Sequence, residues 1–162
     1  MQLDLLGPLA IASLDRIVIS VWRDIPFRKM YKLRMPPLMV DPDITPTNFP
    51  IDLSVPPVAS RALITFNRAA RTEEVDRLVA AASGARHSQV DVVLALAVSD
   101  TVPERPVLAL RPRREHAGRV WGLCLTSGFG TRKLYTTFAD PHWVTPAEYG
   151  FLVEWDGETC PF

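Results

Sequence analysis

The sequence has few cysteines, few lysines and no net charge. Two cysteines among 162 residues are too few for a disulfide framework, and they lack the spacing of metal ligands. Eighteen basic residues balance eighteen acidic ones, so the overall charge predicts no particular partner. No apolar run reaches the roughly 18 residues that a membrane-spanning helix needs, and the first residues lack the basic start of a signal peptide. We therefore expect neither a signal peptide nor a transmembrane segment.

What is present suffices for one folded domain. Apolar residues make up 48% of the chain and charged residues 22%, and the mean hydropathy is +0.08. A chain of this length buries about 70% of the surface that its unfolded form exposes, so it can fold without a disulfide or a metal. We expect a single domain over residues 1–162, without a cofactor.

Proline is concentrated in one part of the chain. Eight of the fifteen prolines lie between Pro26 and Pro57. Each proline removes a backbone donor and favours extended backbone in the residue before it, which predicts an extended arm or long loop over residues 35–57. The arm also carries apolar side chains that need a surface to cover. That surface can belong to its own domain or to a neighbouring subunit, and the sequence leaves both open.

Regular structure is predicted on both sides of the arm. Residues 72–83 form the one clear helix, because Thr72 fits an N-cap, apolar residues follow at helical spacing, and Gly84 fits the position after the helix. A hairpin joins residues 119–126 to residues 131–138 through a glycine-bearing loop. A helical turn is expected at residues 145–148. Residue type and alternation predict further strands over residues 14–22, 62–66, 90–98, 107–110 and 151–155.

Together these patterns predict an α+β, strand-dominated fold with an antiparallel C-terminal sheet. The order of strand, helix and strand over residues 62–98 is compatible with a parallel crossover or with a split arrangement in which the two strands are not neighbours.

No motif in the sequence specifies a reaction. The loop of residues 127–133 contains a Gly-x-Gly pattern with two cations, but a strand rather than a helix follows it, which favours a hairpin turn over a phosphate site. The histidines are far apart in sequence and close to predicted turns, so exposed loop residues are favoured over a zinc site assembled by folding. They are His87, His116 and His142.

A small hydrolase is the alternative function from the enzyme class. Its site would use the loop residues Asp140 and His142, with Cys124 as a thiol nucleophile. Asp140 and His142 are only two residues apart, and Cys124 lies within a predicted strand, without the helix N-terminus that lowers the pKa of a thiol. The pattern therefore gives this hypothesis little support.

Charge is distributed unevenly along the chain. Residues 23–34 and 105–119 each contain five cations and one anion, whereas residues 35–60 and 134–162 contain three and five acids and no Lys or Arg. Such segments can neutralise each other within the fold or pair between copies. They can also hold nucleic acid, but a dedicated binder usually has a basic domain overall. A nucleic-acid-binding accessory protein is therefore the third hypothesis.

The arm, the segmental charge and the missing catalytic motif favour a non-catalytic structural subunit of a multi-copy assembly. Among such assemblies we expect a virion component, in the head, neck or tail of a bacteriophage. Its partners would be copies of itself and other subunits, without a membrane or a small-molecule substrate, and its location the virion or, if it is not viral, the cytoplasm. The predicted partner interface consists of Arg23, Arg28, Lys29, Lys32, Arg34, Met35, Leu38, Met39, Ile44, Phe49, Arg111, Arg113 and Arg114.

Overall fold

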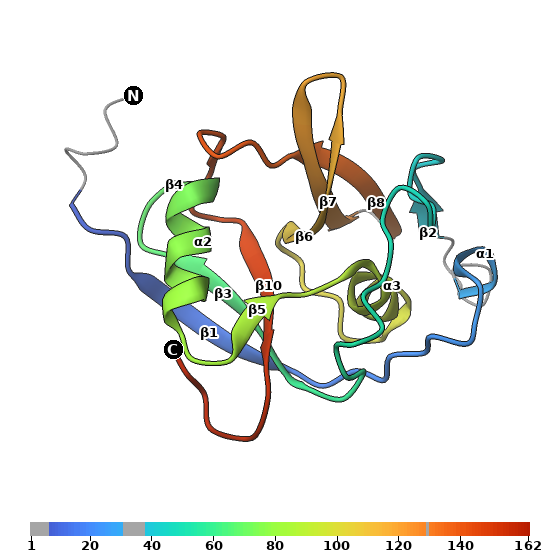
Figure 1. Ribbon diagram of the computed structural model, residues 1–162, viewed down its shortest axis with the longest axis horizontal. Helices are drawn as coiled ribbons and strands as arrows, with labels where there is room; N and C mark the ends of the chain where they lie inside the picture. The colour runs from blue at the N-terminus through green and yellow to red at the C-terminus, as the bar shows by residue number, and fades with distance from the viewer. Residues whose placement is uncertain (1–6, 31–37, 129) are drawn as a thin grey trace.

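The computed structural model describes residues 7–30, 38–128 and 130–162, apart from the side chains at positions 28, 30, 112 and 113 (Figure 1). It is a strand-dominated α+β fold, as the sequence predicts. In chain order its elements are β1 (Ile11–Ile17), α1 (Phe27–Met30), β2 (Leu38–Val40), β3 (Ser60–Phe66), β4 (Ala70–Arg71), α2 (Thr72–Ala81), β5 (Ala85–His87), α3 (Val90–Val98), β6 (Val107–His116), β7 (Arg119–Gly128), β8 (Thr131–Phe138), β9 (Val144–Thr145) and β10 (Gly150–Trp155).

One large mixed sheet organises the fold. Its strands follow the order β1, β3, β10, β6, β7, β8 and β2, while β5 pairs with β10 beside this path, and β4 and β9 form a separate pair. The predicted hairpin is present as the antiparallel pair of β7 and β8. The sheet is not antiparallel throughout, because β10 lies parallel to β6 and β2 lies parallel to β8. The last strand thus inserts between β3 and β6 instead of extending the hairpin.

Both faces of the sheet are buried. In β6, Val107 and Ala109 belong to one apolar cluster, and Leu108 and Leu110 belong to the other. This alternation follows from the strand, in which successive side chains point to opposite faces. Helix α3 contributes most of its residues to the first cluster, and helix α2 contributes to the second. The sheet therefore lies between two helices, each of which covers one face.

The prediction of a strand over residues 90–98 is wrong, because this segment is helix α3. All of its residues except Val98 are buried. When every side of a segment is covered, apolar residues occur at every position, and periodicity no longer distinguishes a strand from a helix. The alanines and leucines in the second half of the segment are good helix formers, and they favour the observed conformation.

Helix α2 starts where it was predicted and ends earlier. It spans Thr72–Ala81, two residues short of the predicted end, and Gly84 follows with a φ of +72°. Arg71 rather than Thr72 is the N-cap residue, and its backbone N–H donates to the Glu74 carboxylate at 2.9 Å. The turn predicted at residues 145–148 is a single turn, closed by the Tyr149 N–H on the Pro146 carbonyl.

The strand predicted over residues 14–22 is displaced towards the N-terminus. Strand β1 covers Ile11–Ile17, and the chain after it has no strand partner among the described residues. The predicted alternation still holds there, because Ile17, Ile19 and Val21 pack against the core while Val18 and Trp22 are exposed.

The described part of the arm, from residue 38 onwards, lies against its own domain. Leu38, Ile44 and Phe49 are buried in the same apolar cluster as α3. Two polar contacts hold the arm further along: the Gln89 side chain bonds both backbone groups of Asp52, and the guanidinium of Arg23 donates to the Val55 carbonyl. The arm is thus an integral part of one face of the core.

Candidate functional site

The structure separates the apolar residues of the predicted interface into two groups. Leu38, Ile44 and Phe49 lie inside the core, and not at the surface where the interface hypothesis places them. Met39, on the edge strand β2, is exposed over 57% of its surface. Met35, which the predicted interface also includes, is outside the described residues. Of the arm residues in the prediction that the structure describes, Met39 alone is available to a partner.

Two basic residues of the predicted interface form ion pairs within the chain. Arg23 binds Asp91 at 2.9 Å, and Arg111 binds Asp52 at 2.9 Å. The second pair joins a basic segment to an acidic one, as expected if the segments neutralise each other within the fold. Lys29 is exposed on α1. The side chains of Arg28 and Arg113 and the whole of Lys32 and Arg34 lie outside the described residues.

The residues of the hydrolase alternative face different surroundings. Cys124 is buried, and burial raises the pKa of its thiol to about 11, so the thiol is protonated at neutral pH. Asp140 accepts from the Arg119 guanidinium at 2.8 Å and from the Val120 N–H, and these bonds lower the pKa of its carboxyl. The exposed His142 lies 3.6 Å from Glu73. These contacts give a thiol hydrolase no geometric support.

The remaining histidines do not form a metal site in the described part of the chain. His87 contacts Asp76 at 2.9 Å, and His116 lies at the end of β6. Within residues 7–30, 38–128 and 130–162, no group of three His, Cys, Asp or Glu side chains lies close enough together to hold a metal ion.

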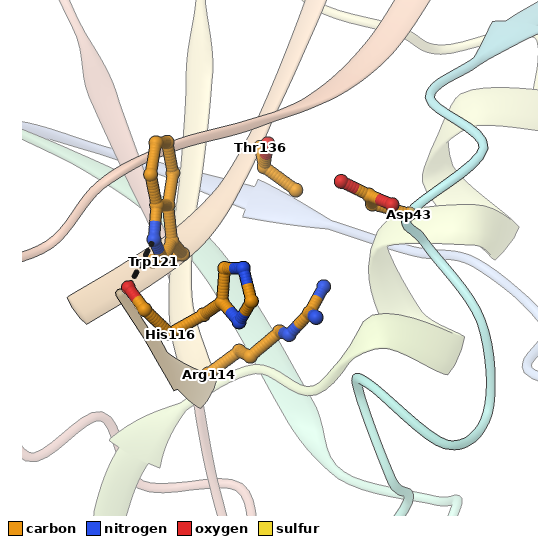
Figure 2. Close-up of a pocket in the computed structure, with 5 residues that line it drawn as sticks. All are labelled: Asp43, Arg114, His116, Trp121 and Thr136. Carbon is orange, nitrogen blue, oxygen red and sulfur yellow. Dashed lines mark hydrogen bonds between the residues drawn. The ribbon is translucent and has the colours of Figure 1, made fainter. Parts of the chain in front are cut away.

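A polar hollow lies at the end of the sheet face that α3 covers. Five side chains from three strands and one loop line it, and Figure 2 shows them around a common space. Trp121 and Thr136 come from β7 and β8, and Arg114 is the strand partner of Trp121 in β6. His116 ends β6, and Asp43 closes the hollow from the loop after β2. The hollow is shallow, with a volume of about 70 Å³, and it opens to solvent.

Contacts behind the hollow hold its walls in place. The ring of Phe138 packs 4.5 Å from the ring of Trp121, and the Trp121 Nε1–H donates to the His116 carbonyl. Asp41 holds the opposite wall, because its carboxylate accepts from the Asp43 backbone N–H at 2.9 Å and from the Thr136 hydroxyl at 3.3 Å. The shape of the hollow therefore does not depend on a ligand.

Three polar side chains of the hollow remain available for binding. The structure places no hydrogen-bond or ion-pair partner from the described residues on the Asp43 carboxylate, the Arg114 guanidinium or the His116 ring. The neighbouring arginines differ from Arg114 because each has an ion-pair partner: Arg111 binds Asp52, and Arg119 binds Asp140. The hollow can therefore offer a ligand an acceptor, donors and an aromatic face together.

A second surface feature is an apolar strip formed by Val18, Trp22, Leu53 and Val58. All four side chains are exposed, Val18 over 91% and Val58 over 85% of their surfaces. They lie on two neighbouring segments, because residues 16–19 and 59–61 line a common cleft and Arg23 bonds the Val55 carbonyl. The apolar strip thus lies on the segment that follows β1 and on the segment that leads into β3, beyond the paired ends of these two strands.

The sequence predicts only part of these sites. Its charge pattern indicates Arg114, but it does not indicate Trp121 and Thr136, which share a sheet face through the register of the predicted hairpin. Pairing that hairpin explicitly would have placed the two residues on the same face. It could not have placed Asp43 there, since the arm reaches β8 only through the parallel pairing of β2.

In the described part of the chain, no helix has the length and apolar character needed to cross a membrane. Comparisons with protein-family models, with curated proteins and with solved structures found no match to this chain.

Proposed function

We propose that this protein is a non-catalytic structural subunit of a multi-copy assembly, in which copies contact each other at the open edges of the sheet. The observation that carries the proposal is the apolar strip on the segments that follow β1 and precede β3. Exposed apolar side chains are ordinary when scattered singly, but a contiguous group of them indicates an interaction surface. Here four such side chains lie on two neighbouring segments, one after β1 and one before β3.

The two ends of the sheet support this proposal. Strands β1 and β2 are the terminal strands, and no other strand in the described part of the chain pairs with the outer edge of either. An open edge presents backbone N–H and C=O groups to any extended segment that reaches it. Addition of a strand from another molecule is a common way to use such an edge.

A second copy of the chain is the occupant that we propose for these edges. The apolar strip lies just past the end of β1, and the edge strand β2 carries the exposed Met39. Contact between the β1 edge of one copy and the β2 edge of the next would join two different surfaces. Such a head-to-tail contact repeats from copy to copy, and it generates a ring or a filament.

The proline-rich arm has a place in this proposal. Its inner residues fill the core of its own domain, whereas Met39 and Leu53 are exposed. The arm would therefore supply Met39 to the contact at β2 and Leu53 to the apolar strip. Its prolines restrict the backbone, which lowers the entropy lost when a contact orders it.

The more specific part of the proposal is that the assembly is a virion, with this chain as a component of a bacteriophage head, neck or tail. Support for it comes from the proposed head-to-tail contact, since rings and tubes built from one repeated subunit are the architecture of such structures.

Charge introduced on the apolar strip should prevent assembly without unfolding the subunit. We expect wild-type protein to form rings or longer oligomers as its concentration rises, and the double variant Val18→Glu, Val58→Glu to remain monomeric. Both valines are almost fully exposed, so the substitutions should change the free energy of unfolding by less than about 0.5 kcal/mol per site. Light scattering over a concentration series gives the mass, and electron microscopy shows the shape of the particles.

The matched control is Val144→Glu, which places the same charge on an exposed valine outside the apolar strip. It should assemble like the wild type. Wild-type protein that is folded and monomeric at every concentration would contradict self-assembly, and rings or tubes formed equally well by the double variant would contradict the role of the apolar strip. Deletion of the arm would not be informative, because it would remove Phe49 from the core.

A further inference from the structure

We propose that the polar hollow between β6, β7, β8 and the loop after β2 binds a carbohydrate, with one pyranose ring stacked on the indole of Trp121. This activity is separate from the proposed assembly contact, because the hollow lies on β6 to β8 and the apolar strip lies beyond β1.

The indole of Trp121 is held as a platform. Phe138 packs against it at 4.5 Å, and its only hydrogen-bond donor, Nε1–H, is already used by the His116 carbonyl. The face of the indole ring therefore remains for a ligand. Figure 2 shows the ring edge-on beside the hollow. A pyranose carries C–H groups on one side, and these form an apolar surface that suits an aromatic face.

The other walls of the hollow match the hydroxyl groups at the rim of a sugar ring. Each hydroxyl both donates and accepts, so a sugar needs acceptors and donors side by side. The Asp43 carboxylate accepts two or more bonds, and the Arg114 guanidinium donates in a planar fork. The Thr136 hydroxyl donates to Asp41, which leaves its lone pairs as acceptors. His116 adds a ring that can donate through one nitrogen and accept through the other.

The charges of the hollow favour an uncharged ligand. Asp43 and Arg114 carry opposite charges, and neither has an ion-pair partner among the described residues. A phosphorylated ligand would gain from Arg114 but would be repelled by Asp43, whereas a neutral polyol can bond to both. The contribution of each bond to a charged side chain is larger than that of a bond between neutral groups.

The test is a binding titration of the full chain with defined oligosaccharides. Maltotetraose, cellotetraose and chitotetraose serve as probes, and calorimetry and the tryptophan fluorescence of the protein report binding. We expect at least one of them to bind with a dissociation constant below about 1 mM, the usual upper range for specific weak binding. Asp43→Asn should weaken that binding by about tenfold, through the loss of a charged acceptor. Trp121→Ala should abolish it.

The control for charge is Asp15→Asn, an exposed aspartate on β1 that should leave binding unchanged. The Asp43→Asn variant should fold like the wild type, because the Asp43 side chain is exposed and supports no part of the core. A loss of binding in this variant can therefore be assigned to the hollow. Failure of a folded wild-type protein to bind any of the three oligosaccharides would overturn the proposal. Binding that Asp43→Asn leaves intact would overturn it too, as would saturable binding of guanosine or adenosine in place of sugars.

Discussion

Replacement of Phe49 by alanine should lower the free energy of unfolding by about 3–5 kcal/mol. Phe49 lies in the proline-rich arm, yet its side chain is fully buried among the residues that pack against α3. Truncation removes the apolar surface of the ring and leaves a cavity that the surrounding side chains fill only in part. Urea denaturation followed by tryptophan fluorescence measures the change.

Leu53→Ala is the matched control for this prediction, since Leu53 lies on the same arm and is exposed. Its effect on unfolding should stay within about 0.5 kcal/mol. A small effect of Phe49→Ala in the monomer would show that the arm does not belong to its own core. A large effect that appears only in the assembled protein would mean that the arm packs on a neighbouring copy instead.

Arg23→Ala should lower the free energy of unfolding by a similar amount, about 3–5 kcal/mol. Its partner Asp91 sits in the first turn of the buried helix α3 and is only 1% exposed, while Arg23 is 16% exposed. Removal of the guanidinium leaves a buried carboxylate without its counter-ion, which is far more costly than loss of a surface pair. It also removes the hydrogen bond to the Val55 carbonyl, which ties the arm to the chain after β1.

The control is Arg77→Ala, which breaks an exposed pair with Glu73 at 3.6 Å. Exposed pairs contribute little, so this change should cost less than about 1 kcal/mol. Adding Asp91→Leu to the Arg23→Ala variant should restore part of the lost stability, because the second substitution removes the unpaired carboxylate. Equal effects of Arg23→Ala and Arg77→Ala would show that Asp91 is hydrated and not buried as the structure has it.

The core contacts of Phe49 and Arg23 bear on the proposed assembly. Phe49 and the pair of Arg23 and Asp91 would complete the fold of one chain before it meets another. The contact between copies would then involve only the outer residues of the arm and of the sheet edges. Assembly would therefore require no exchange of core residues between neighbours.

The elements that the sequence predicts correctly depend on local patterns. The hairpin of β7 and β8 follows from two alternating segments around a glycine-bearing loop, and it appears with the predicted limits extended by two residues at Gly128. Helix α2 follows from its capping residues and its apolar spacing. Both can be predicted because neighbouring residues determine them.

The elements that the sequence misassigns depend on what covers them. Residues 90–98 are apolar at almost every position, and only the surrounding sheet and arm decide that they form a helix. The charged segments are a similar case. Their composition alone leaves open whether they pair within the chain, and the folded structure brings Arg111 to Asp52 and Arg119 to Asp140.

The sequence by itself therefore determined the class of the fold, the hairpin, helix α2 and the apolar character of the arm, because each depends on residues close together in the chain. The tertiary structure alone decided the position of β10 between β3 and β6, the buried helix α3 and the hollow that joins Asp43 to Trp121. Each of these depends on contacts between residues far apart in sequence, and no local pattern encodes such contacts.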